Sequence, residues 1–176
     1  AAQGVASRII LKMNTLTDEK LMEALVHAGQ AGVQIDLIIR GACMLPALRP
    51  GVTDNIRVRS IIGRFLEHSR VFYFRTGNDE SLYLSSADWM NRNMLRRVEL
   101  AWPVEDAALR QRVIDECLVA YLHDNVDAWS LNADGQYTRV QPTKPKRTSI
   151  KAAQPTTPVP LHGAQAALMA LYAAKS

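Results

Sequence analysis

The chain has 176 residues, 48% of them apolar, which is enough for one domain with its own core and a tail, and no apolar run is long enough to cross a membrane. The net charge is +4, but residues 141–176 hold five basic and no acidic residues, leaving 16 basic against 17 acidic residues elsewhere. The basic character therefore belongs to the tail, and it does not indicate that the folded part binds a polyanion.

The first forty residues predict a βαβ unit. The chain opens with "AAQGVASRIILKMN", without an initiator methionine, and a strand begins almost at once, which is typical of a piece of a longer protein. Residues 7–13 and 33–40 are apolar runs of strand length. Between them, Thr15 or Thr17 is expected to cap a helix that ends near Gly29. The expected buried stripe of this helix consists of Leu21, Met22, Leu25 and Val26. Short joints imply parallel pairing of the two strands.

The next hundred residues predict more strands and one long helix. Residues 56–60 alternate between apolar side chains and arginine, as a strand does. Residues 71–74 and 81–86 flank turn residues and predict a hairpin. A further strand is expected at residues 96–102, and residues 105–124 have the pattern of an amphipathic helix. The expected fold class is α/β, with a mixed β-sheet flanked by helices.

Three segments are expected along the chain. Residues 1–140 form the folded domain, residues 141–163 are a Pro/Lys-rich linker, and residues 164–176 form a short C-terminal helical tail. Two cysteines, Cys43 and Cys117, are too few for a disulfide framework. This cysteine content favours a reducing compartment, and we expect a cytoplasmic protein, free in the cytoplasm or peripheral at the inner membrane.

Arginines are concentrated before the predicted hairpin. Between positions 40 and 70 there is no lysine, and six arginines are opposed by two acidic residues; the arginines are Arg40, Arg49, Arg57, Arg59, Arg64 and Arg70. The guanidinium fork binds two phosphate oxygens at once. Arg40 ends a predicted parallel strand, where open α/β sheets place ligands. The cluster therefore indicates phosphate binding, against the alternative of a solvated face. Arg57 and Arg59 either belong to this phosphate-binding group or face solvent.

A histidine lies within this cluster, in the stretch "GRFLEHSR". The order His68-x-Arg70, then a hairpin, then a Ser-Ser-Ala-Asp element and Glu99, resembles the phospholipase D-like pattern. In that pattern the imidazole attacks phosphorus or protonates the leaving oxygen, Arg70 and Ser86 hold phosphate oxygens, and Glu99 orients the ring. Two positions depart from it, since Arg70 replaces lysine and Asp88 replaces asparagine. Three roles stay open for Asp88: it binds a metal, pairs with an arginine or faces away from the site.

Longer blocks extend the resemblance over residues 5–140. The blocks "KMN" (12–14), "IDLIIRGACMLPALRPG" (35–51), "DNIRVRSIIGRFLEHSR" (54–70) and "SADWMNRNMLRRVE" (86–99) are similar to the C-terminal catalytic domain of the long, multidomain bacterial polyphosphate kinases. The chain departs from that family at Ser85, where glycine is usual, and in the loop after residue 41. The resemblance also implies a phospholipase D-like half as the fold.

The resemblance implies a function and partners. Such enzymes reversibly transfer the terminal phosphate of ATP to inorganic polyphosphate through a phosphohistidine, which would lie in a preceding domain. His68 would be the second catalytic histidine, and Arg40 would contact nucleotide phosphates. Mg²⁺ is implied as a cofactor, with ligands mostly outside this chain, and we expect no metal site within it. The implied partners are ATP or ADP, polyphosphate, upstream domains of the same enzyme and a second copy in a homo-oligomer; no nucleic acid is expected.

Two other functions stay open from the residues alone. One is a phosphodiesterase or nuclease of the phospholipase D type, in which two copies of the chain present their His68 side chains to each other. The other is a non-catalytic module that binds polyanions through the arginine loop.

Overall fold

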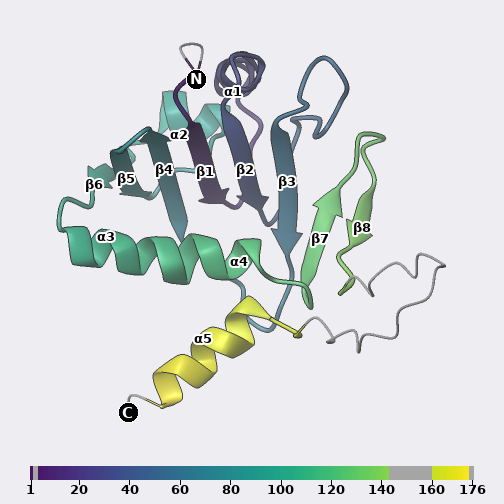
Figure 1. Cartoon of the computed structure of the whole chain (residues 1–176). Helices are drawn as coiled ribbons and strands as arrows, with labels where there is room; N and C mark the ends of the chain where they lie inside the picture. Colours follow the sequence, from purple (N-terminus) through teal and green to yellow (C-terminus); the bar gives the residue numbers. More distant parts are fainter. Residues whose placement is uncertain (2–3, 143–159, 175–176) are drawn as a thin grey trace.

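The computed structural model describes residues 1, 4–142 and 160–174. Its centre is one eight-stranded sheet with the strand order β6-β5-β4-β1-β2-β3-β7-β8 (Figure 1). The strands are β1 (Ser7–Met13), β2 (Gln34–Ile39), β3 (Ile56–Ile61), β4 (Arg70–Thr76), β5 (Asp79–Ser85), β6 (Ala101–Pro103), β7 (Ala128–Leu131) and β8 (Tyr137–Arg139). β1, β2 and β3 pair in parallel and the remaining neighbours are antiparallel, which confirms the predicted mixed α/β class.

The predicted βαβ unit and hairpin are both confirmed. Helix α1 (Glu19–Gln30) connects β1 to β2, but its cap is Asp18, whose carboxylate accepts a hydrogen bond from the Leu21 N–H, rather than Thr15 or Thr17. β4 and β5 pair in register across a turn in which Gly77 has a φ of +58°. Glycine suits that position because it adopts positive φ without a Cβ clash.

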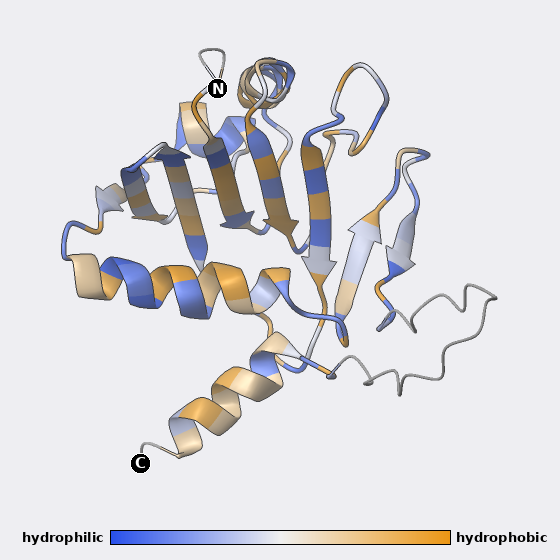
Figure 2. Cartoon of the chain, in the orientation of Figure 1, coloured by the Kyte–Doolittle hydropathy of each residue, from blue (hydrophilic) through white to orange (hydrophobic). Residues whose placement is uncertain are grey.

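Helices cover both faces of the sheet, so the domain has two cores. Alternate side chains of the central strands point to opposite faces. Leu11, Leu37 and Val58 pack with Leu25 of α1 on one face. Ile10 belongs to the second core, with residues of the long helix from Ala107 to Leu122, which crosses in front of the sheet in Figure 1. Figure 2 shows the resulting hydrophobic stripes in the central strands.

Two predicted elements need correction. Residues 96–102 are not one strand: helix α2 (Asn91–Arg96) ends at their first residue, and only Ala101 and Trp102 belong to β6, which pairs with β5 through all three of its residues. The helix expected at 105–124 is present, but it consists of α3 (Ala107–Val113), a π-helical segment η1 (Ile114–Val119) and α4 (Ala120–Leu122).

The C-terminal tail contains a helix, α5 (Ala164–Ala173), that begins beside the end of α4. Most of the expected linker lies outside the described residues, so the three-segment division stays a prediction. Among the residues that the structure describes, no helix combines the length and hydropathy needed to span a bilayer. Cys43 and Cys117 are free thiols.

Candidate active site

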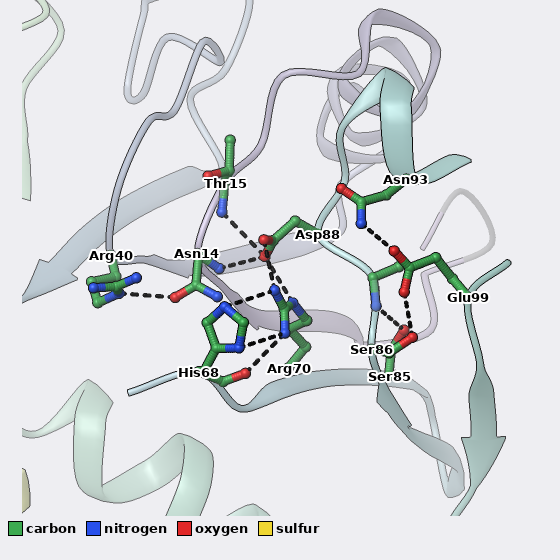
Figure 3. A network of polar contacts seen from close by, with 11 residues as sticks. Asn14, Thr15, Arg40, His68, Arg70, Ser85, Ser86, Asp88, Asn93 and Glu99 are labelled. Carbon is green, nitrogen blue, oxygen red and sulfur yellow. Dashed lines mark hydrogen bonds and ion pairs between the residues drawn. The ribbon is translucent and has the colours of Figure 1, made fainter. Parts of the chain in front are cut away.

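The candidate site lies at one edge of the sheet, where β1 and β2 end and β4 begins. Because β4 runs antiparallel to β1, the start of β4 meets the end of β1. Asn14 follows β1, Arg40 follows β2, and His68 precedes Arg70, the first residue of β4. Figure 3 shows these four side chains together with Asp88, which follows β5. The topology thus gathers residues that are up to 74 positions apart.

His68 is exposed and lies against the guanidinium of Arg70. The Arg70 Nη1 atom is 3.3 Å from His68 Nδ1, and Nη2 is 3.2 Å from Nε2. Arg70 Nη1 also donates to the His68 carbonyl oxygen at 3.1 Å. Arginine can only donate, and an imidazole has at most one nitrogen without a proton, so at most one of the two ring contacts is a hydrogen bond. The guanidinium therefore fixes the ring while leaving it open to solvent.

Asp88 holds Arg70 in a two-pronged ion pair. Arg70 Nε donates to Oδ1 at 3.0 Å and Nη2 donates to Oδ2 at 2.8 Å, and both side chains are buried. Asp88 also accepts hydrogen bonds from the backbone N–H groups of Asn14 and Thr15. Burial alone would raise the pKa of Asp88, but the hydrogen bonds from Arg70 and Asn14 and the charge of Arg70 outweigh it and lower that pKa. Of the three alternatives for Asp88, the arginine partner is the one observed.

Arg70 is engaged within the fold, where its guanidinium contacts the Asp88 carboxylate and the His68 ring. Its expected role in holding phosphate oxygens stays a prediction. The physical reason for the ion pair is the substitution noted in the sequence, since aspartate at position 88 supplies a carboxylate that matches the arginine fork. Asp88, Arg70 and His68 form a chain of contacts that connects the end of β1 to the imidazole.

Arg40 and Asn14 form the other part of the site. Arg40 Nε donates to Asn14 Oδ1 at 2.8 Å, and the Arg40 carbonyl accepts from the Ser60 hydroxyl. Asn14 is buried, and its Nδ2 atom has no hydrogen-bond partner within the described part of the chain. Because Arg40 fixes which atom of the amide is the oxygen, the other atom is a buried donor without an acceptor. A small cavity here is lined by Asn14 and Arg40 together with Lys12, Glu67, Ser69 and Tyr121.

A buried polar cluster lies under this cavity. The Nζ atom of Lys12 is 2.5 Å from Glu67 Oε2 and 3.4 Å from the centre of the Tyr121 ring. The Tyr121 hydroxyl donates to the other oxygen of Glu67. Burial lowers the pKa of Lys12 despite the attraction of Glu67. For Glu67, burial favours a higher pKa, but the charge and hydrogen bond of Lys12 prevail and lower it. These contacts of Lys12 and Tyr121 fix Glu67, the residue directly before His68.

Comparison with known proteins assigns the domain. A family model described as polyphosphate kinase C-terminal domain 2 matches residues 1–152. This chain belongs to that family. Polyphosphate kinase of Pseudomonas aeruginosa is 59% identical over 143 residues, which are 81% of this chain and 21% of that protein. The enzyme of Paraburkholderia phytofirmans is 51% identical over 149 residues, 85% of this chain and 22% of that protein.

A solved polyphosphate kinase also has this fold. The crystal structure of polyphosphate kinase from Porphyromonas gingivalis matches with a TM-score of 0.80 and 35% identity, covering 98% of this chain and 24% of that one. The chain thus spans about a fifth of the length of the curated relatives described above. The matched region is therefore a small part of proteins that are several times longer.

In this polyphosphate kinase domain, Glu99 and Ser86 contact each other. The Glu99 carboxylate accepts hydrogen bonds from the Ser86 hydroxyl and the Asn93 amide, while Arg70 is the side chain that contacts the His68 ring (Figure 3). Hydrogen bonds from Ser86 and Asn93 lower the pKa of Glu99. Asn93 belongs to α2, and Ser86 directly follows β5. The expected roles of Glu99 in orienting the imidazole and of Ser86 in holding phosphate oxygens stay predictions.

Arg57 and Arg59 lie on the second face of the sheet, the face to which Ile61 of the same strand contributes a core residue. Arg59 Nη1 donates to the carbonyl oxygens of Tyr121 at 2.9 Å and Leu122 at 2.5 Å, so it caps the end of α4. Arg57 is largely exposed and lies 3.7 Å from Asp36. The Arg59 guanidinium is thus engaged by the backbone, and a phosphate-binding role for Arg57 and Arg59 stays a prediction.

No metal site is evident in the described ranges 1, 4–142 and 160–174. No group of three or more histidine, cysteine, aspartate or glutamate side chains lies close enough there to hold an ion.

Sequence reasoning missed Asn14, Lys12 and Glu67. Lys12 and Asn14 were visible only as part of the "KMN" block, although a lysine inside the apolar run "RIILKM" is itself a signal. A charged residue at an inward position of a buried strand must have a partner, and that partner is 55 residues away. The sequence contains the lysine, but the distant partner only emerges from the strand order.

Proposed function

We propose that this domain is part of an ATP:polyphosphate phosphotransferase of the cytoplasm, which reversibly transfers the terminal phosphate of ATP to inorganic polyphosphate. Membership of the polyphosphate kinase family supports this activity. The histidine that carries the phosphate covalently belongs to a preceding domain, and His68 is the second catalytic histidine. ATP or ADP and polyphosphate are the substrates of the complete enzyme.

One observation carries the proposal for this site: a buried amide donor without an acceptor lies between Arg40 and the exposed His68. A buried donor without a partner destabilises a protein by about 1–3 kcal/mol, so a fold retains one where a ligand completes it. A phosphate oxygen is an acceptor that suits both this N–H and the Arg40 fork. The terminal phosphates of a nucleotide have several such oxygens.

The roles of the residues follow from charge. When the bond between the terminal phosphorus of ATP and the ADP oxygen breaks, the electron pair stays on ADP, and negative charge on that oxygen increases. Arg40 and the Asn14 amide are placed to offset this charge. His68, held by Arg70, contacts the moving phosphoryl group from the solvent side and stabilises it or moves a proton to its leaving oxygen. Arg70 and Asp88 are positioning residues for the ring.

The test is a substitution of His68 in the complete enzyme. We expect His68→Ala to lower polyphosphate synthesis and the reverse formation of ATP by about 10²–10⁴-fold, the range typical of a lost acid–base group. The melting temperature should change little, because His68 is exposed. His27→Ala, at an exposed position of α1, is the matched control and should retain full activity.

The same experiment separates the other functions. Full polyphosphate synthesis in His68→Ala would refute the assignment. Cleavage of a phosphodiester by the isolated chain, lost in His68→Ala, would favour the phosphodiesterase. Polyphosphate binding without turnover in any longer protein would favour the binding module.

A further inference from the structure

We propose that the C-terminal helix α5 positions the catalytic loop of this domain, and that Gln165 is the residue through which it acts. The catalytic loop is residues 62–69, which connect β3 to β4 and carry His68. The effect on turnover rests on the proposed function, whereas the effect on the loop does not. Gln165 lies 97 positions from His68 in sequence, and no motif of the chain indicated a connection between them.

The Gln165 amide makes three hydrogen bonds, all with the catalytic loop. Its Oε1 atom accepts from the Phe65 N–H at 2.8 Å, and its Nε2 atom donates to the Phe65 carbonyl at 3.0 Å. The same Nε2 atom donates to Glu67 Oε1 at 2.8 Å. The side chain is buried, and these contacts use both sides of its amide. A polar group that is buried and satisfied in this way orders what it contacts.

Gly63 gives the amide its space. A Cβ atom built on Gly63 would lie 2.5 Å from Gln165 Oε1 and 2.9 Å from its Cδ atom. Any other residue at position 63 would displace the amide or the loop. The glycine of the "GRFLEHSR" stretch is therefore explained by a side chain from the far end of the chain.

The start of α5 is itself anchored to the body of the domain. The Ala164 N–H donates to Asp124 Oδ2 at 2.7 Å, and Asp124 is almost fully buried. His162 N donates to Asn125 Oδ1 at 2.8 Å. Gln165 thus follows a fixed point, and its amide has little freedom to leave the loop. Most later residues of α5 are partly or fully exposed.

The catalytic loop depends on polar contacts because it buries little apolar surface. Phe65 is 48% exposed and Leu66 is 81% exposed. A segment without buried apolar side chains is ordered mainly by its hydrogen bonds. Glu67 is held on one side by Lys12 and Tyr121 and on the other by Gln165. Removing Gln165 releases Phe65 entirely from these contacts and leaves Glu67 held from one side, one residue before His68.

The experiment uses the complete enzyme with Gln165→Met, which keeps the length and helix propensity of the side chain but makes no hydrogen bond. Amide hydrogen exchange and steady-state kinetics are measured together. We expect exchange in residues 62–69 to rise about tenfold or more, and kcat to fall about tenfold with little change in the Michaelis constant for ATP. The global melting temperature should change by only a few degrees.

Tyr172→Phe is the matched control. It removes the contacts of the Tyr172 hydroxyl with Arg112 and Glu116 at the other end of α5 and leaves the loop contacts intact. It should change neither loop exchange nor kcat. A second variant, Gln165→Glu, keeps the acceptor for Phe65 but sets a carboxylate against Glu67, and it should raise loop exchange as Gln165→Met does.

Three outcomes would overturn the proposal: unchanged exchange in residues 62–69, an equal rise in Tyr172→Phe, or a rise spread evenly over the domain. Failure of the proposed function has a different signature. If His68→Ala retains activity, the catalytic assignment is lost, yet faster loop exchange in Gln165→Met still supports the helix as the element that holds the loop.

Discussion

Two arginine-bearing regions of this domain differ in what their guanidinium groups contact. At the ends of β1 and β2, Arg40 bonds a single side-chain oxygen and lies beside a buried donor without a partner. On β3, Arg59 bonds the last carbonyl groups of α4, and Arg57 faces Asp36 across the sheet. The first region retains capacity for a ligand, whereas in the second the Arg59 guanidinium is engaged within the fold and Arg57 is largely exposed.

The difference shows why a count of arginines does not locate a phosphate site. Arg40, Arg57 and Arg59 belong to the same arginine-rich stretch; Arg40 directly follows β2, and the other two lie on β3, which pairs with β2 in parallel. The two regions differ in how many hydrogen-bond acceptors of the protein lie near the guanidinium groups. The end of a helix offers free carbonyl oxygens, and these attract Arg59. The end of β1 offers one amide oxygen, and the rest of the site stays available for an anion.

The largest effect on stability is expected for Asp88→Asn. This change leaves the buried Arg70 guanidinium without a carboxylate and should lower the free energy of unfolding by about 3 kcal/mol at pH 7. Loss of the His68 anchor should also lower kcat strongly. Chemical denaturation with a kinetic assay measures both quantities, and Asp79→Asn, an exposed position in the adjacent hairpin, is the control.

The same ion pair predicts that the stability of the domain depends on pH. The pKa of Asp88 is lower in the folded protein than in the unfolded chain, so its stabilisation is present above the unfolded value and is lost as pH falls toward the folded value. The unfolded value is about 3.9. The stability gap between wild type and Asp88→Asn should therefore narrow below about pH 4. A gap that stays constant down to about pH 2 would contradict the ion pair.

The next effect is expected for Asn14→Asp, which directly tests the arginine comparison. The carboxylate keeps an acceptor for Arg40 but replaces the unpartnered donor with a negative charge. If phosphate binds there, the Michaelis constant for ATP should rise about tenfold or more, because a lost donor and a new repulsion act together. Asn78→Asp, in the exposed β4–β5 turn, is the control. Unchanged kinetics would mean that the donor faces no substrate.

Much of the fold could be predicted because it follows from local patterns. Apolar runs and alternation predicted the strands at residues 7–13, 33–40 and 56–60, and turn residues between two short strands predicted the hairpin. The segment at 96–102 was misread because "RRVELAW" has strand-like residues, although its first residue ends a helix. Local propensity there is overruled by the contact of Asn93 with Glu99.

The site was predictable only in part, for a different reason. Arg40 and His68 could be proposed from the sequence because each belongs to a recognisable stretch. The contacts that hold the loop before His68 could not, since those of Lys12 with Glu67 and of Gln165 with Phe65 span 55 and 100 positions. Such pairs become visible only when the strand order brings them together. The one partner that chemistry could suggest was an arginine for Asp88, because a buried carboxylate needs a cation.

The smallest effects are expected on β3, and they decide whether the second region is purely structural. Arg59→Met should lower the free energy of unfolding by about 1–2 kcal/mol, because the end of α4 loses a charged donor. Arg57→Met should change it by less than about 0.5 kcal/mol, since an exposed pair at 3.7 Å contributes little. Both variants should retain the Michaelis constant for polyphosphate. A rise of that constant in Arg57→Met, without loss of stability, would instead place the polyphosphate chain along this face and make Arg57 part of its channel.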